Sequence, residues 1–187
     1  MIVHNDKSVF SLKKMTLASM FASITIVMSF ISIPLPFSPV PITGQTFALM
    51  LSGSLLYPIT SLFSMIIYLA LGAVGIPVFA GFHGGISILL GPTGGYLLAM
   101  PIASFVISSL MRIADTSFFK LILANIIGGI LIVYALGVLQ LSVVAGLEIK
   151  KAVLLGAVPY TLGDLIKVLT SSYLSLKLKP VLKMYKD

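Results

Sequence analysis

The stretch between Lys14 and Arg112 constrains this chain most, because residues 15–111 contain no lysine, arginine, aspartate or glutamate. A soluble domain carries about 25% charged residues, whereas this chain of 187 residues is 9% charged and 58% hydrophobic. A lipid bilayer accepts such a stretch, since a spanning helix needs about 20 consecutive apolar residues. The sequence therefore predicts an integral membrane protein, and its composition excludes a soluble globular domain and a disordered chain.

The charges that the chain does carry are concentrated in a few places. The formal net charge is +7, and the basic residues outside the spans lie near the two ends of the chain and in two short connections. Nucleic-acid binding would need an exposed basic face, so we predict no nucleic-acid partner. Basic residues grouped on one side of the spans are instead typical of a membrane protein in a lipid bilayer.

We predict an all-α protein that forms a single membrane domain over residues 1–187. The apolar run from Met15 to Ile33 is long for a signal peptide and ends at Pro34 without a small-residue cleavage site, so it is read as a retained helix. The prolines from Pro34 to Pro41 interrupt regular helix. The six expected spans are residues 15–33, 43–57, 59–74, 95–111, 121–141 and 159–178.

The number of spans depends on Tyr57 and Pro58, which could form a turn between two helices or a kink in one. Five spans divide the basic residues into five inside and six outside, whereas six spans divide them into nine inside and two outside. The positive-inside rule favours six spans with both termini in the cytoplasm. The nine cytoplasmic residues are then Lys7, Lys13, Lys14, Arg112, Lys120, Lys177, Lys179, Lys183 and Lys186.

Motifs of an enzyme are missing from the sequence. It contains no G-x-x-x-x-G-K-[ST], G-x-S-x-G or H-E-x-x-H motif. The two histidines, His4 and His83, are far apart and there is no cysteine, so we expect no metal site and no cofactor. If the chain takes part in active transport, the ATP must be hydrolysed by another chain.

Asp164 and Lys167 are the strongest candidates for a binding site. They are three residues apart, so they share one face of a helix within the sixth expected span. A charge inside a span costs about 2.5–3.5 kcal/mol on insertion scales, and ionisable residues there generally mark substrate sites. One interpretation is a pair that meets a polar ligand in a cavity; the other is a salt bridge that only stabilises the helix.

Three irregular segments are expected on the outer side, at the level of this pair. They are the proline-rich segment with Thr43 and Gln45, residues 78–85 and residues 91–96. Irregular backbone at membrane depth is tolerated where it is buried in protein or lines a cavity. An ordinary flexible loop is the alternative, but Phe79 and Phe82 favour an apolar lid. The candidate binding residues in these segments are Thr43, Gln45, Phe79, Gly81, His83, Thr93 and Tyr96, and Tyr160 at the start of the sixth expected span is a further candidate.

The first expected helix has a face of small residues. Ala18 and Ala22 form a small-xxx-small step, and Ser19 and Ser23 form another beside it. Such faces let helices approach closely in lipid. This face could pack inside the bundle, or it could dock on another subunit.

Four motifs resemble the BioY family, the biotin-specific S-components of energy-coupling factor (ECF) transporters. They are PVPITGQT at residues 39–46, GAVGIPVFAG at 72–81, LGPTGGYL at 90–97 and GDLIK at 163–167. The resemblance implies a six-helix S-component bundle in a bacterial plasma membrane, an outer biotin site, and coupling to one membrane subunit and two ATPases. Ala18 and Ala22 match the motif with which S-components dock on the coupling subunit.

The resemblance also implies roles for the charged pair. Asp164 would accept hydrogen bonds from the ureido N–H groups of biotin. Lys167 would donate to the ureido oxygen or to the carboxylate. An S-component for a different vitamin is the alternative function. A membrane enzyme is disfavoured because the sequence shows no set of catalytic groups, and a channel is disfavoured because it would need polar residues in several spans.

Overall fold

The computed structural model describes residues 11–112 and 117–184, and the side chains up to residue 180. His4, Lys7, Lys186 and the side chain of Lys183 therefore lie outside the described part. The elements are α1 (Leu12–Phe30), β1 (Ser32–Leu35), β2 (Ser38–Thr43), α2 (Gln45–Leu55), α3 (Pro58–Ala73), η1 (Ala80–Phe82), α4 (Ile86–Leu90), α5 (Gly94–Arg112), α6 (Phe118–Asn125), η2 (Ile126–Ile132), α7 (Val133–Ala145), α8 (Ile149–Gly156), η3 (Val158–Tyr160) and α9 (Thr161–Met184).

The chain is mostly helical, as the sequence predicts. Three stretches are long and apolar enough to cross a membrane by length and composition: Gly94–Arg112, Phe118–Ala145 and Ile149–Pro180. The helix Pro58–Ala73 is apolar but shorter. Helix α2 has only 11 residues, which is about 16 Å at 1.5 Å per residue, so the expected span 43–57 is only partly helical.

Tyr57 and Pro58 separate two helices. Helix α2 ends at Leu55 and α3 begins at Pro58, with Tyr57 extended at φ −71° and ψ 152°. A residue before proline is driven out of the helical region, and proline is well suited to the first turn of the next helix. The guanidinium of Arg112, at the end of α5, lies 4.2 Å from the centroid of the Tyr57 ring.

The expectation of an all-α chain is wrong in one element, the β1–β2 hairpin. Its two strands are antiparallel, with Ser32 opposite Thr43 and Leu35 opposite Ser38, and the register is irregular between Ile33 and Leu35. Strand β1 contains one proline and β2 contains two. Prolines have no N–H to donate and are confined to edges and bulges. In a two-stranded hairpin both strands are edge strands, so the hairpin accommodates a proline-rich segment that cannot form a helix.

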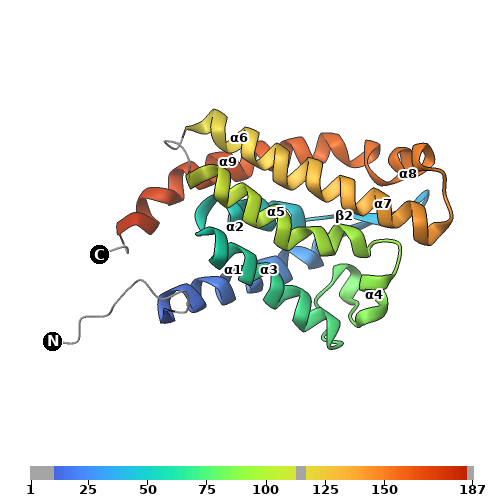
Figure 1. Ribbon diagram of the computed structural model, residues 1–187, viewed down its shortest axis with the longest axis horizontal. Coiled ribbons are helices and arrows are strands. Elements are labelled where there is room, and N and C mark those ends of the chain that lie inside the picture. The colour runs from blue at the N-terminus through green and yellow to red at the C-terminus, as the bar shows by residue number, and fades with distance from the viewer. Residues whose placement is uncertain (1–10, 113–116, 185–187) are drawn as a thin grey trace.

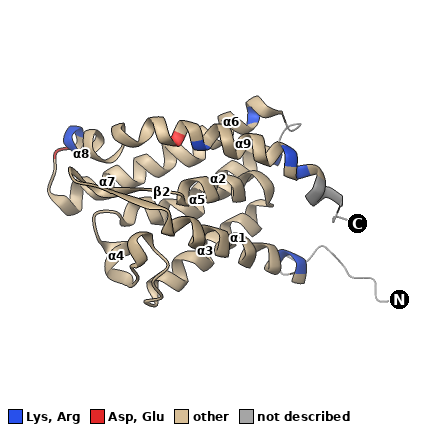
Figure 2. Cartoon of the chain, turned by 180° about the vertical axis from the view of Figure 1, so that it is seen from behind, with Lys and Arg blue, Asp and Glu red and all other residues tan. Residues whose placement is uncertain are grey.

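Figure 1 shows the start of α1 and the end of α9 on one side of the molecule and α4 and α8 on the opposite side. The charged residues follow this polarity. Figure 2 shows lysine and arginine at the start of α1 and α6 and near the end of α9, a second group at α8, and little charge between them. The exception between the two ends is the pair Asp164 and Lys167 in α9.

Close helix packing at the centre depends on small residues. A Cβ on Gly53 of α2 would lie 2.7 Å from the Ile107 Cβ of α5, and one on Gly128 of η2 would lie 2.4 Å from the Ile107 Cγ1. Ile107 itself is fully buried. Because association in lipid is driven by packing and hydrogen bonds, these two glycines allow α2 and η2 to approach α5 closely.

A buried amide joins α2, α6 and α9. The Asn125 Oδ1 accepts from the Ser54 hydroxyl at 3.1 Å, and its Nδ2 donates to Ser171 and Ser172 at 3.3 and 3.0 Å. All four residues are buried. These bonds fix the register of α9 against α2, and that register brings the charged pair of α9 beside the start of α2.

The structure does not support an outward docking face made of Ala18 and Ala22. Their exposed fractions are 3% and 2%, and Ala22 packs in the same cluster as Met65 and Tyr68 of α3. Their small side chains let α3 approach α1 closely, so this face is used inside the bundle. The neighbouring Ser19 and Ser23 are exposed.

We expect Ala18→Leu/Ala22→Leu to destabilise the protein, because inserting methylene groups into a packed site costs about 1–3 kcal/mol. The matched control is Ser19→Leu/Ser23→Leu on the exposed face of the same helix. Thermal unfolding in detergent should show a lower midpoint for the alanine pair than for the serine pair. Equal midpoints would contradict the inward packing.

Candidate functional site

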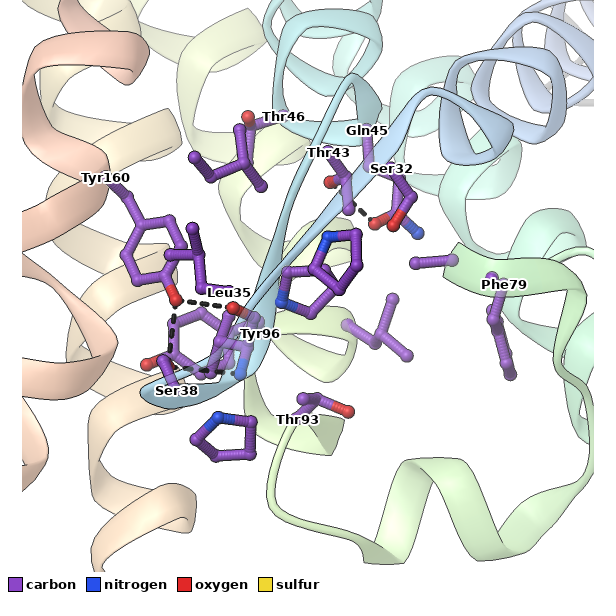
Figure 3. Close-up of a pocket in the computed structure, with 18 of the residues that line it drawn as sticks. Ser32, Leu35, Ser38, Thr43, Gln45, Thr46, Phe79, Thr93, Tyr96 and Tyr160 are labelled. Atoms are coloured by element: carbon purple, nitrogen blue, oxygen red, sulfur yellow. Dashed lines mark hydrogen bonds between the residues drawn. The ribbon is translucent and has the colours of Figure 1, made fainter.

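One cavity of about 530 Å³ lies between the hairpin, the loop before α4 and helices α5, α7 and α9. This volume is in the range of small-molecule sites. Figure 3 shows Tyr160, Tyr96 and Ser38 on one side of the cavity and Phe79 on the other. All ten substrate-binding residues expected from the sequence line it: Thr43, Gln45, Phe79, Gly81, His83, Thr93, Tyr96, Tyr160, Asp164 and Lys167.

The charged pair forms a compact hydrogen-bonded group. The Lys167 Nζ donates to the Asp164 Oδ1 at 2.7 Å and to the Thr46 Oγ1 at 2.9 Å. The Thr46 hydroxyl donates to the same Oδ1 at 3.2 Å, and the Tyr134 hydroxyl donates to the Asp164 Oδ2 at 2.6 Å. Asp164 is buried and Lys167 is half-buried. The pair is thus a salt bridge that lines a cavity, a geometry compatible with either interpretation.

The position of Asp164 in α9 favours its charge. It lies in the first turn of the helix, directly after the one-turn helix η3. The N–H groups at a helix N-terminus carry partial positive charge and stabilise a carboxylate there. The sequence builds this arrangement with Pro159, which lies within η3, and Asp164 in the first turn of the next helix.

The hairpin and the start of α2 supply a second polar group. The Thr43 hydroxyl donates to the Gln45 Oε1 at 2.8 Å, as Figure 3 shows, and the Gln45 amide donates to the Tyr68 hydroxyl. Gln45 is 7% exposed. A buried amide must be hydrogen-bonded, and these partners hold its orientation.

Two tyrosines attach the hairpin and α5 to the segment before α9. The Tyr160 hydroxyl bonds the Val40 carbonyl and lies 2.9 Å from the Ser38 Oγ. The Tyr96 hydroxyl donates to the Gly156 carbonyl at 2.8 Å. A Cβ on Gly137 would lie 2.3 Å from the Tyr96 ring, so glycine is needed there for the ring to lie along α7.

The loop between α3 and α4 forms the opposite wall. Phe79 is fully buried, its ring packs against the Tyr68 ring with centroids 5.5 Å apart, and a Cβ on Gly72 would overlap it. His83 is exposed at the rim of the cavity, and its Nδ1 lies 2.9 Å from the Ala80 carbonyl oxygen.

The tip of that loop is held by an aromatic contact. Gly81 and Phe82 both have positive φ, at 71° and 59°. The Phe82 ring is exposed and stacks on Phe30 of α1 with centroids 4.4 Å apart. An exposed apolar ring over the cavity fits the expected lid.

The two residues that bond the charged pair from other helices, Thr46 and Tyr134, are missing from the sequence-based set. Thr46 lies within the quoted motif, one residue after Gln45, and only the tertiary structure brings it to the charged pair. Tyr134 lies in an apolar helix, and its signal is its hydroxyl, since a buried tyrosine hydroxyl normally finds a partner. Within the described ranges, no three His, Cys, Asp or Glu residues gather as a metal site would require.

A comparison of the sequence with models of protein families identifies the family of this chain. The sequence model of the BioY family matches residues 4–184. The chain belongs to the BioY family. The biotin transporter BioY of Thermotoga maritima is 39% identical over 90% of this chain and 96% of its own length. The probable biotin transporter BioY of Pyrococcus horikoshii is 38% identical over 89% of this chain and 96% of its own length.

A solved structure has the same fold as this BioY chain. It is the crystal structure of the S-component for biotin from an ECF-type ABC transporter, with a TM-score of 0.85 and 27% identity over 96% of this chain and 95% of that one. This match confirms the expected S-component-like bundle. The membrane transporter family and the apolar helices agree with the predicted membrane protein.

We expect the charges of Asp164 and Lys167 to depend on each other for stability. Removing one partner of a buried pair costs up to about 3–5 kcal/mol, whereas removing both charges is often near neutral. Asp164→Asn and Lys167→Met should each lower the unfolding midpoint of the ligand-free protein, and the double variant should recover part of the loss. A double variant that loses the sum of the two single effects would contradict the pairing.

Proposed function

We propose that this chain is the biotin-binding membrane subunit of an ECF transporter and mediates biotin uptake. The observation that carries the proposal is a cavity whose largely apolar wall contains one pair of opposite charges, Asp164 and Lys167. Biotin matches it with an apolar thiophane ring and chain and a ureido group that both donates and accepts hydrogen bonds. The relatives are transporters by name and not enzymes.

We propose further that the ureido ring, and not the carboxylate, meets the charged pair. The Lys167 ammonium is already neutralised by Asp164 at 2.7 Å. A biotin carboxylate at this place would put two negative charges against one positive charge in a buried site, which is costly. The neutral ureido group keeps the site neutral and bonds both partners, while the carboxylate points toward the rim, where His83 is exposed.

A six-span arrangement with both termini in the cytoplasm also belongs to the proposal. It is supported by the separation of the charges, with Lys13, Lys14, Arg112 and Lys120 near one end and Lys150 and Lys151 in α8 near the other. The second crossing then combines β2 with the short helix α2. Extended backbone at this depth is acceptable because the hairpin lines the cavity. The membrane is proposed to be a bacterial plasma membrane.

Accumulation of biotin needs energy from other chains. The sequence contains no phosphate-binding loop, so we propose one membrane coupling subunit and two ATPases as partners. An S-component for a different vitamin is the second candidate, because the same fold with other cavity residues would serve it. Equilibrium binding of labelled biotin to the purified protein decides between the two.

For the site, we expect Asp164→Asn and Lys167→Met each to weaken biotin binding about tenfold or more, since a lost bond to a charged group costs about 1.5–3 kcal/mol. The double variant should remain weak although its stability partly recovers, which separates binding from folding. Titration calorimetry in detergent measures the binding, and thermal unfolding measures the stability. Single variants that bind within twofold of the parent would contradict the site.

The orientation of the ligand is tested with two analogues of biotin. Biotin methyl ester should keep most of the affinity, because its ureido ring is intact, whereas a thiophane valerate without the ureido ring should lose it. The opposite order would show that Lys167 binds the carboxylate.

For the topology, we expect single cysteines to report their side of the membrane, since the chain has none of its own. Phe37→Cys and Glu148→Cys lie at exposed outer positions, and Lys13→Cys and Lys120→Cys lie at exposed inner positions. An impermeant thiol reagent should label only the first two in intact cells. Labelling at position 120 before lysis would contradict the six-span arrangement.

A further inference from the structure

The Asp164 carboxylate has one acceptor position left for a ligand. A carboxylate offers about four lone pairs, two on each oxygen. Lys167 and Thr46 occupy both positions on Oδ1, and Tyr134 occupies one on Oδ2. The remaining lone pair belongs to Oδ2, and Asp164 lines the cavity. The direction of that lone pair follows from the plane of the carboxylate, which the Tyr134 bond restrains.

Tyr134 lies just after an irregularity in its helix. It is the second residue of α7 and follows directly on η2, a π-helical segment over Ile126–Ile132. Such segments insert extra residues into a helix and are frequent at functional sites. Val133 and Tyr134, the two residues after η2, both line the cavity. Gly129 within η2 packs against Met50 of α2, because a Cβ on Gly129 would lie 2.5 Å from the Met50 Cε.

We propose that Tyr134 is a positioning residue, which holds the Asp164 carboxylate so that one lone pair of Oδ2 accepts one N–H of the ureido ring. This inference rests on the proposed function. The Tyr134 bond is short, at 2.6 Å, as hydrogen bonds from hydroxyls to ionised oxygens are. It also makes the two ureido N–H groups unequal, because only one of them can meet Asp164.

The test is a double-mutant cycle on biotin affinity. Tyr134→Phe keeps the ring and removes only the hydroxyl, so it should raise the Kd about tenfold in the parent protein. In the Asp164→Asn background, the same change should alter the Kd less than twofold. Tyr96→Phe is the matched control, because its hydroxyl bonds the Gly156 carbonyl, and its effect should be equal in both backgrounds.

A measurement on the parent protein alone tests the proposal even if the Tyr134→Phe variant folds poorly. Two biotin analogues, each methylated on a different ureido nitrogen, should differ at least tenfold in Kd. Equal affinities of the two analogues, or a Tyr134→Phe effect that persists unchanged in Asp164→Asn, would overturn the positioning role. If the parent protein does not bind biotin at all, the proposed function fails instead.

Discussion

The ion pair between Asp164 and Lys167 is the interaction on which the rest of the binding region depends. A charge at membrane depth is costly unless it is paired and hydrogen-bonded. The pair meets this requirement with partners from two other helices, Thr46 of α2 and Tyr134 of α7. Helices α2, α7 and α9 must therefore converge at one level, and the cavity lies where they do.

Convergence of these helices requires close approach further along the bundle. Gly53 and Gly128 admit Ile107 between α2 and η2, and Gly129 admits Met50. The amide of Asn125 fixes α9 against α2 through buried serine hydroxyls. Packing and hydrogen bonds provide the attraction between helices in lipid, so these contacts hold the geometry of the site from a distance.

The hairpin and the loop before α4 close the cavity with different kinds of contact. The hairpin is attached to η3 and α8 by hydrogen bonds of Tyr160 and Ser38. The loop tip is held by the exposed stack of Phe82 on Phe30, with Phe82 at positive φ. Hydrogen bonds at a buried position resist opening more than one exposed ring contact does. The loop tip at Gly81 and Phe82 is therefore the part of the wall better suited to move, while Phe79 at its base is fully buried.

The sequence by itself determined the membrane class, the helical content and the identity of the charged pair, because these follow from composition, apolar run length and spacing. It also marked the helix break at Pro58 and the ten candidate binding residues, all of which line one cavity. Each of these features is local, or belongs to a motif that carries the resemblance to the BioY family.

Only the tertiary structure decided which residues meet across the chain. Thr46 and Tyr134 bond Asp164 from 118 and 30 residues away in sequence, and no local pattern relates such positions. It also turned Ala18 and Ala22 inward, because a small-residue face serves packing inside a bundle as well as docking outside it. The hairpin is a further case: the prolines exclude helix, but strand pairing depends on a partner segment and on the helices that cover it.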